Sequence, residues 1–309
     1  DAPVDVAIVE VGMGGTWDAT SVADAQVAVV APISLDHTHL LGTTVAQIAA
    51  EKSGIIKPGS VAVLAGQLPE AAKVLAARCA EVGAPLRREG VEFGLLDRQA
   101  AVGGQLLRIE GMDGPVGDLF LPLFGAHMAH NAALAVAAVE AFRAAPLAAE
   151  VISDGLGAVI APARLEMVDD DPVVVLDTAH NTAGVQATLA GLREAYVAQP
   201  LIGLVAMMRD KAVAEVLDLL AEELDTIVIT TMPEIDRSMT AAELSDLAGE
   251  SFEANRIRSA PDPGHAIQMA RGLAQQAGPQ AVVLVIGSVY LAGQIKALLA
   301  TAAGAGEDF

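Results

Sequence analysis

Two residues in the first part of the chain could hold a divalent cation together. Glu10 closes an apolar run, Val4 to Val11, whose β-branched residues predict a buried strand. His37 follows a second such run, Val27 to Ile33. Open α/β sheets bind ligands beyond the carboxyl ends of their strands, so a carboxylate and an imidazole there could share one crevice, which near phosphate favours Mg²⁺. The alternative for Glu10 is a carboxylate that faces water before an ordinary glycine-rich turn.

Lys52 lies on a predicted short helix, Val45 to Ser53, and is a candidate for the same site. An ammonium group repels a metal ion, but a desolvated lysine loses its proton readily. The neutral amine can then take up CO2 to form an anionic carbamate, which binds metal. The alternative is a surface helix lysine that pairs with an acid.

A second group of polar residues surrounds the first strand of the second half. Asp177, His180 and Asn181 follow the predicted strand Val173 to Leu176, at a position where α/β folds bind ligands. The alternative is that Asp177 and Asn181 cap the next helix. Arg164 precedes the strand and could bind phosphate through its guanidinium fork, or it could be a surface arginine.

A third group, His127, His130 and Asn131, stands before an alanine-rich helix predicted to end near Ala144. The start of a helix is suited to ligand contacts, but Asn131 could equally be an ordinary helix residue or a cap. No pair here has zinc-site spacing, and the single cysteine, Cys79, cannot form a cysteine zinc site.

Strands and helices alternate in both halves of the chain, which is typical of α/β domains with parallel sheets. A linker at Ala161-Pro162 divides the chain into predicted domains 1–160 and 161–309. The segment Glu89 to Leu123 has short runs split by Gly and Asp, which predict antiparallel strands. The second domain is predicted to be doubly wound. Its expected strands are 173–176, 201–206, 226–231 and 281–286, and its expected helices are 183–196, 212–224, 241–248, 263–277 and 290–300.

Composition narrows the class of partner. The 309 residues include 39 acidic and 18 basic side chains, a net charge of -21, which argues against nucleic acid and against anionic lipid as partners. A single cysteine fits a reducing compartment. No apolar run reaches membrane-spanning length and no signal peptide opens the chain. We therefore expect a cytoplasmic protein, and we expect it to be a monomer.

Taken in order, these motifs resemble the bifunctional dihydrofolate synthase and folylpolyglutamate synthase family of the Mur ligase superfamily. The resemblance covers nearly the whole chain. Its matching stretches are VEVGMGGTWDATS, ISLDHTHLLG, AAEKSGII, LFGAHMAHNAA, PARLE, LDTAHN, MMRDK and IGSVYLAG. The glycine turn followed by WDAT is similar to the folate branch rather than to the cell-wall ligases.

The resemblance implies a role for each matched residue. Those it marks as magnesium ligands are Glu10, His37 and a carbamylated Lys52; those that line the pterin-substrate site are Trp17, Asp18 and Ala19; those that bind ATP are Asn131, Arg164 and Asp177. His180 falls where the family has a histidine near the phosphates, so Lys52 and His180 are the expected catalytic residues.

The implied fold is a partial Mur-ligase-like central ATPase domain followed by a Rossmann-like C-terminal domain. The implied reaction joins L-glutamate to dihydropteroate, to reduced folates or to both, with ATP as co-substrate and through an acyl phosphate. The alternatives are a cell-wall Mur-type amide ligase and a non-catalytic paralogue that binds a nucleotide or folate.

One family motif does not occur in this sequence. The family has a glycine-rich phosphate loop near its N-terminus, but no G-x-x-x-x-G-K-[ST] is found here. In the family that loop lies upstream of the segment that begins this chain. We therefore expect that the chain is truncated before Asp1, and that the chain starting at Asp1 does not catalyse ligation.

Overall fold

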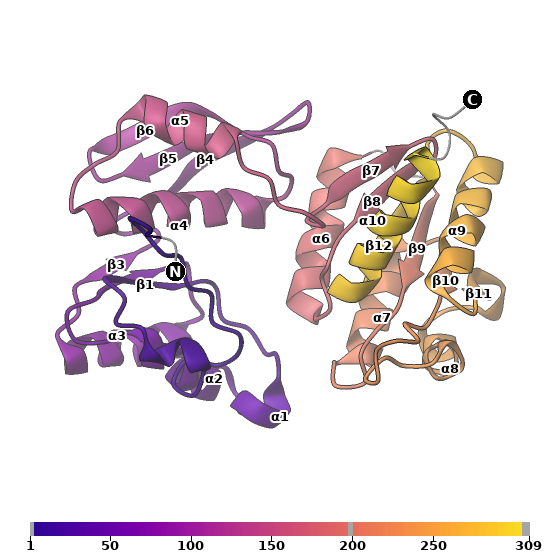
Figure 1. The fold of residues 1–309 in the computed structure, drawn as a ribbon, viewed down its shortest axis with the longest axis horizontal. Helices are drawn as coiled ribbons and strands as arrows, with labels where there is room; N and C mark the ends of the chain where they lie inside the picture. The colour runs from indigo at the N-terminus through magenta and orange to yellow at the C-terminus, as the bar shows by residue number, and fades with distance from the viewer. Residues whose placement is uncertain (1–2, 197–199, 305–309) are drawn as a thin grey trace. The chain divides into compact units, whose positions relative to one another are not determined.

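The structure is a computed structural model that describes residues 3–196 and 200–304 (Figure 1). Contacts between Cα atoms divide the chain into two compact units. The first unit comprises residues 1–99, 106–121 and 127–158, and the second comprises residues 100–105, 122–126 and 159–309. None of the described helices is both long and apolar enough to cross a membrane.

The first unit contains a three-stranded parallel sheet in the order β1-β2-β3. Its strands are β1 (Val27–Val30), β2 (Val61–Leu64) and β3 (Leu86–Arg88), and its helices here are α1 (Thr38–Leu41), α2 (Val45–Lys52) and α3 (Pro69–Val82), with the 3-10 helices η1 (Ala19–Val22) and η2 (Ser53–Ile55). Helix α2 starts at a capping box, and α3 starts at a proline and ends at a left-handed Gly83. Ile48 and Leu75 pack these two helices against the strands. The predicted parallel β-α-β arrangement is confirmed.

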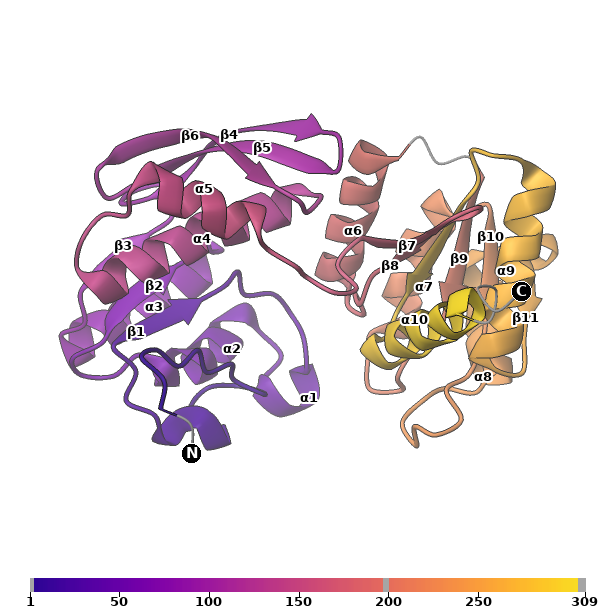
Figure 2. The same ribbon diagram turned by 45° about the horizontal axis from the view of Figure 1, so that its top comes forward.

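A second sheet of three strands belongs mostly to the same unit. Its order is β4-β5-β6, and its strands are β4 (Gly94–Ala101), β5 (Gly104–Gly111) and β6 (Gly114–Leu121). Two-residue connections make these strands antiparallel, as predicted. The alanine-rich helix α4 (Ala126–Arg143) lies between the two sheets of this unit, and α5 (Ala149–Gly157) packs along β6 (Figures 1 and 2).

The predicted strand Val4 to Val11 is wrong. Residues 3–18 form no strand, and the apolar side chains of this run face outward, with Ile8 97% exposed. Among the strands of the described residues, β1 stands at the edge of its sheet and pairs only with β2. An apolar, β-branched run becomes a strand only through ladder bonds and burial, and the described chain provides neither for this run. Glu10 therefore does not end a buried strand.

The second unit is a six-stranded sheet in the order β11-β10-β9-β12-β8-β7, parallel except for β7. Its strands are β7 (Glu166–Asp170), β8 (Val173–Leu176), β9 (Leu201–Val205), β10 (Thr226–Ile229), β11 (Ile257–Ser259) and β12 (Val282–Ile286). Its helices are α6 (Thr182–Ala195), α7 (Val213–Glu223), α8 (Ala241–Ser251), the 3-10 helix η3 (Ala254–Arg256), α9 (Pro263–Ala277) and α10 (Val289–Gly304).

Helices cover both faces of this sheet, which confirms the doubly wound fold. Val175 faces a core built with α6, α7 and α8. Its neighbours Val174 and Leu176 face a separate core built with α9 and α10. Successive residues of a strand point to opposite faces, so an uninterrupted apolar strand is what a sheet buried on both sides requires.

Two strands of this sheet, β7 and β11, were not predicted from the sequence. The first reads EMVDD, and three acids in five residues do not predict a strand. It forms at the edge of the sheet by pairing antiparallel to β8, with Glu166 opposite Leu176. This pairing positions the residues that precede β7.

Candidate functional site

Asp177 lies just beyond the carboxyl end of β8 and is only 2% exposed. Its Oδ1 accepts hydrogen bonds from the Ala179 amide at 2.8 Å and from the Thr188 hydroxyl at 2.9 Å. Its Oδ2 accepts from the Leu165 amide at 3.0 Å. The carboxylate therefore ties together the end of β8, helix α6 and the turn before β7.

Arg164 lies in that turn. Because β7 is antiparallel to β8, the start of β7 lies at the carboxyl end of β8, beside Asp177. Both neighbours of the arginine, Ala163 and Leu165, have left-handed backbone conformations, with φ of 53° and 49°. Its guanidinium donates a hydrogen bond to the Thr178 hydroxyl. The structure thus brings Arg164 and Asp177 together at the carboxyl edge of the sheet, which is the edge formed by the carboxyl ends of its parallel strands.

His180 and Asn181 share this edge. Nδ1 of His180 lies 2.9 Å from the Thr178 carbonyl oxygen, and since a carbonyl can only accept, Nδ1 carries the proton in this contact. Asn181 caps α6, because its Oδ1 accepts from the Gly184 amide at 2.8 Å. The capping alternative therefore holds for Asn181 but not for Asp177.

Gly287, beyond the end of β12, closes on the same edge. Its amide donates to the Ala179 carbonyl at 2.9 Å. Its φ is 105°, and a Cβ there would lie 2.6 Å from the Ala206 carbonyl oxygen, so only glycine fits. This glycine lies within the motif IGSVYLAG, and no role was predicted for it; a glycine just past a buried strand was the available signal.

In the first unit, the glycine-rich turn of residues 12–15 packs on the end of α2. The Thr16 amide and hydroxyl donate to the Glu51 carbonyl at 3.1 and 3.0 Å, and the Trp17 amide donates to the Glu51 carboxylate at 3.2 Å. A Cβ on Gly15 would lie 2.7 Å from the Glu51 carbonyl oxygen and 2.8 Å from that of Lys52. The first motif and the one that contains Lys52 therefore touch.

Asp18 organises the segment that follows this turn. It caps η1, and it accepts from the Thr20 amide at 2.9 Å, the Thr20 hydroxyl at 2.6 Å and the Met13 amide at 2.9 Å. These hydrogen bonds, that of the Thr20 hydroxyl first, lower the pKa of Asp18 to about 2. Trp17 is 88% exposed and Ala19 is exposed too. The side chain of Asp18 thus shapes the segment, and those of its two neighbours face outward.

The three expected magnesium ligands lie on different segments. Glu10 is exposed, His37 is the N-terminal cap of α1 with a left-handed φ of 48°, and Lys52 ends α2. In the described ranges, no three His, Cys, Asp or Glu side chains gather where they could hold a metal ion. Magnesium commonly uses one or two carboxylates with water and substrate phosphates, rather than a closed protein cage. The Glu10 carboxylate, and a carbamate on Lys52 if one forms, would supply oxygen ligands of this kind, whereas the imidazole of His37 would supply a nitrogen.

The histidines and the asparagine predicted to precede the alanine-rich helix lie inside it, because α4 begins at Ala126. Asn131 is exposed on its surface. His130 Nδ1 lies 2.5 Å from a carboxylate oxygen of Glu89, whose other oxygen accepts from the Gly66 amide at 2.8 Å. Glu89 follows β3, at the carboxyl edge of the first sheet. No role was predicted for Glu89, because the strand that precedes it, β3, was not predicted either.

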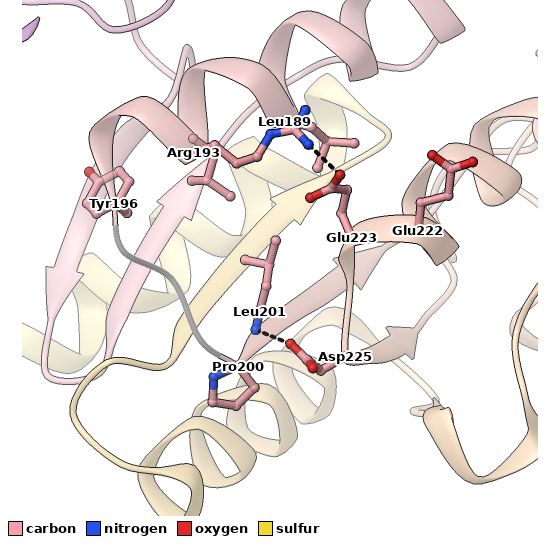
Figure 3. A pocket seen from close by; sticks show the side chains of 9 residues that line it. Leu189, Arg193, Tyr196, Pro200, Leu201, Glu222, Glu223 and Asp225 are labelled. Carbon is pink, nitrogen blue, oxygen red and sulfur yellow. Dashed lines mark hydrogen bonds and ion pairs between the residues drawn. The ribbon is translucent and has the colours of Figure 1, made fainter.

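A surface pocket of the second unit lies at the opposite edge of its sheet, where the parallel strands begin (Figure 3). It is lined by residues that end α6 and α7 and begin β9. Arg193 pairs with Glu223 there, and Asp225 accepts from the Leu201 amide at 2.7 Å. These residues precede their strands, whereas Asp177 follows its strand. The pocket is therefore separate from the site around Arg164 and Asp177.

Comparisons with known proteins match one part of the second unit and nearly the whole chain. Residues 163–289 match the family model described as Mur ligase, glutamate ligase domain. The dihydrofolate synthase/folylpolyglutamate synthase of Mycobacterium tuberculosis is 41% identical over 96% of this chain, and the folylpolyglutamate synthase of Lacticaseibacillus casei is 32% identical over 96%. The chain spans 65% of the first relative and 67% of the second.

Solved structures give the same result. The chain resembles Mycobacterium tuberculosis folylpolyglutamate synthase complexed with ADP with a TM-score of 0.92 and 41% identity, over 96% of this chain and 68% of that one. It resembles E. coli FolC in complex with DHPP and ADP with a TM-score of 0.82 and 29% identity, over 95% and 66%. The chain therefore belongs to the dihydrofolate synthase/folylpolyglutamate synthase family of Mur ligases.

Proposed function

We propose that the protein carrying this chain joins L-glutamate to dihydropteroate, to reduced folates, or to both, at the expense of ATP. The observation that carries the proposal is the match over 96% of the chain to the dihydrofolate synthase/folylpolyglutamate synthase of Mycobacterium tuberculosis, whose folylpolyglutamate synthase was solved in complex with ADP. The chain spans about two thirds of the curated relatives it matches, so this activity is proposed for the whole protein.

The nucleotide part of the proposal rests on the edge that bears Arg164 and Asp177. A guanidinium suits phosphate because its N–H groups can bind two oxygens at once. Phe124, Ile160 and Met167 line a hollow beside Arg164, where a flat base could lie. Asp177 would hold the arginine turn. His180 would lie near the phosphates and contribute to catalysis, with Asn131 as a further ATP contact.

The folate part of the proposal rests on Trp17, Asp18 and Ala19. An exposed indole next to a small residue offers a flat apolar surface, which suits a ring such as a pterin. Asp18 supports that surface through its hydrogen bonds to Thr20 and Met13. The E. coli relative was solved in complex with DHPP, which supports a site of this kind in the family.

The metal part of the proposal assigns Mg²⁺ to Glu10, His37 and Lys52. When bound, Mg²⁺ would reduce the repulsion between the substrate carboxylate and the triphosphate. For Lys52, the neutral Nζ adds to CO2, a C–N bond forms, and the lost proton passes to water, which leaves an anionic carbamate. Its position at the end of α2, against the turn of residues 12–15, supports this role.

The proposed reaction has two steps. A carboxylate oxygen of the pterin-linked substrate attacks the γ-phosphorus of ATP, and the bond to ADP breaks. The amine of L-glutamate then attacks the acyl carbon and phosphate leaves, which forms the amide. Arg164 would bind phosphate oxygens whose charge is redistributed during the first step.

We also propose that the protein is a cytoplasmic monomer. The single cysteine, Cys79, is buried, and burial raises the pKa of its thiol, which fits a thiol with no redox role. The net charge of -21 favours a soluble protein with little self-association. Sedimentation and cell fractionation would test both statements.

The test is an ATP-dependent ligation assay on the whole protein that carries this chain. ADP release should require dihydropteroate or a reduced folate together with L-glutamate. Release with a nucleotide-sugar peptide instead would identify a cell-wall ligase, and ADP binding without any turnover would identify a non-catalytic relative. Either outcome would contradict the proposal.

A further inference from the structure

We propose that Lys57 is a positioning residue for the folate-substrate segment around Trp17, Asp18 and Ala19. This inference rests on the proposed function, which places that segment at the substrate. Nothing in the sequence motifs points to Lys57, which lies in a Lys-Pro-Gly turn between η2 and β2.

The ammonium group of Lys57 holds the end of η1. Nζ donates hydrogen bonds to the Ser21 carbonyl, to the Ala23 carbonyl at 2.9 Å and to the Asp24 carboxylate at 2.9 Å. An ammonium has three N–H donors, so these three acceptors use all of them. The last carbonyls of a helix have no partner within the helix, so a cation at this position is stabilising.

The segment depends on such contacts because it has no core of its own. None of the residues of η1 is buried, and Trp17 is 88% exposed. Apolar burial therefore contributes little to holding the segment in place. Asp18 fixes its start through the Thr20 and Met13 amides, and Lys57 fixes its end. The two charged residues clamp the turn from opposite ends.

The backbone of Lys57 is hydrogen-bonded within its own turn. Its amide donates to the Ser60 hydroxyl at 3.1 Å, and that hydroxyl donates back to the Lys57 carbonyl at 2.8 Å. Ser60 is 1% exposed, and the preceding Ile56 is completely buried. Val61, which follows Ser60, begins β2. Lys57 therefore connects the β1-β2-β3 sheet to the exposed segment.

The contacts of Lys57 differ in importance. Asp24 has an 88% exposed side chain, and exposed ion pairs contribute little. The Ser21 and Ala23 carbonyls would instead lose their donor if the ammonium were removed. Lys57→Met removes all three hydrogen bonds and keeps much of the volume, whereas Asp24→Asn removes only the charge of the exposed partner and is the matched control.

The experiment compares the whole protein with its Lys57→Met and Asp24→Asn variants. Amide hydrogen exchange should rise at Ser21 and Ala23, whose amides donate to the Asp18 and Thr20 carbonyls. In Lys57→Met the KM for dihydropteroate or folate should rise about tenfold, equivalent to a loss of about 1.4 kcal/mol of substrate binding. The KM for ATP and the kcat should stay within about twofold, and Asp24→Asn should behave like the wild type in both assays.

Several outcomes would overturn the inference. Unchanged exchange at Ser21 and Ala23 would do so, and so would an equal rise in both KM values, which indicates general destabilisation. If Lys57→Met does not fold, Lys57→Gln, which retains an amide donor on a shorter side chain, replaces it in the same assays. If the wild type shows no ligation, the proposed function fails, but exchange at the two amides still decides whether Lys57 holds the segment.

Discussion

Asp177 is a buried carboxylate whose contacts hold the turn that carries Arg164. Its oxygens already accept from Leu165, Ala179 and Thr188. The bond from Leu165 bears most directly on Arg164, because Leu165 follows Arg164 in a turn with two left-handed residues. Such a backbone persists only when its surroundings hold it. We infer that Asp177 contributes to ATP binding chiefly by orienting Arg164.

Thr188 offers a way to test this role without removing a charge. Thr188→Val deletes the hydroxyl that donates to Asp177, and Thr188→Ser keeps it. We expect Thr188→Val to lower stability by about 1–3 kcal/mol, because a buried charged acceptor loses a donor. It should also weaken ADP binding, as measured by calorimetry, and Thr188→Ser should restore that binding. If the two variants bind ADP alike, Asp177 does not depend on this contact.

The lowered pKa of Asp18 predicts that the structure of the segment around Trp17, Asp18 and Ala19 depends on pH. This pKa is lowered from 3.8 to about 2 by hydrogen bonds from Thr20 and Met13. Because the folded-state pKa lies below the ordinary value, the stabilisation is fully present above pH 3.8 and is lost as the pH falls through about 2. The NMR signals of the Met13 and Thr20 amides should shift with this midpoint. In Asp18→Asn the shift should disappear, and a midpoint near 3.8 in the wild type would contradict the assignment.

Two contacting segments explain why glycine is required at residue 15. The turn of residues 12–15 lies against the backbone of α2, and a Cβ on Gly15 would meet two carbonyl oxygens within 2.8 Å. Backbone atoms cannot rotate away as the tip of a side chain can. The glycine therefore permits a backbone approach that places the first motif beside Lys52.

We expect Gly15→Ala to destabilise the protein by about 1–3 kcal/mol, the usual cost of overpacking. Gly155→Ala is the control, because Gly155 lies within α5 and an added Cβ meets nothing within 4 Å. That change should be neutral or stabilising by about 0.5–1 kcal/mol, since alanine favours a helix. Urea unfolding of both variants provides the comparison. Equal midpoints would show that the turn does not press on α2.

At the scale of the whole molecule, the two cores of the second unit indicate that this unit folds without the first unit. A polypeptide of residues 159–304 contains every strand of the six-stranded sheet and its helices on both faces. We expect it to unfold cooperatively when followed by circular dichroism. A gradual transition would refute the idea of an independent unit.

The sequence by itself determined the elements whose signals are local. The expected helix 263–277 matches α9, which has a proline in its first turn, and apolar runs predicted β8, β9, β10 and β12. The order of the motifs was sufficient to identify the family. These signals lie within one turn or one strand, where propensity and capping dominate.

Only the tertiary structure decided the features that depend on a distant neighbour. The acidic segment EMVDD becomes β7 because β8 supplies its hydrogen bonds, and this pairing brings Arg164 to Asp177. The apolar run Val4 to Val11 remains outside any sheet because the described chain gives it no ladder partner. Lys57 reads as an ordinary turn lysine until its three acceptors, more than thirty residues earlier, are in place. Long-range pairing and burial, rather than local propensity, determine these outcomes.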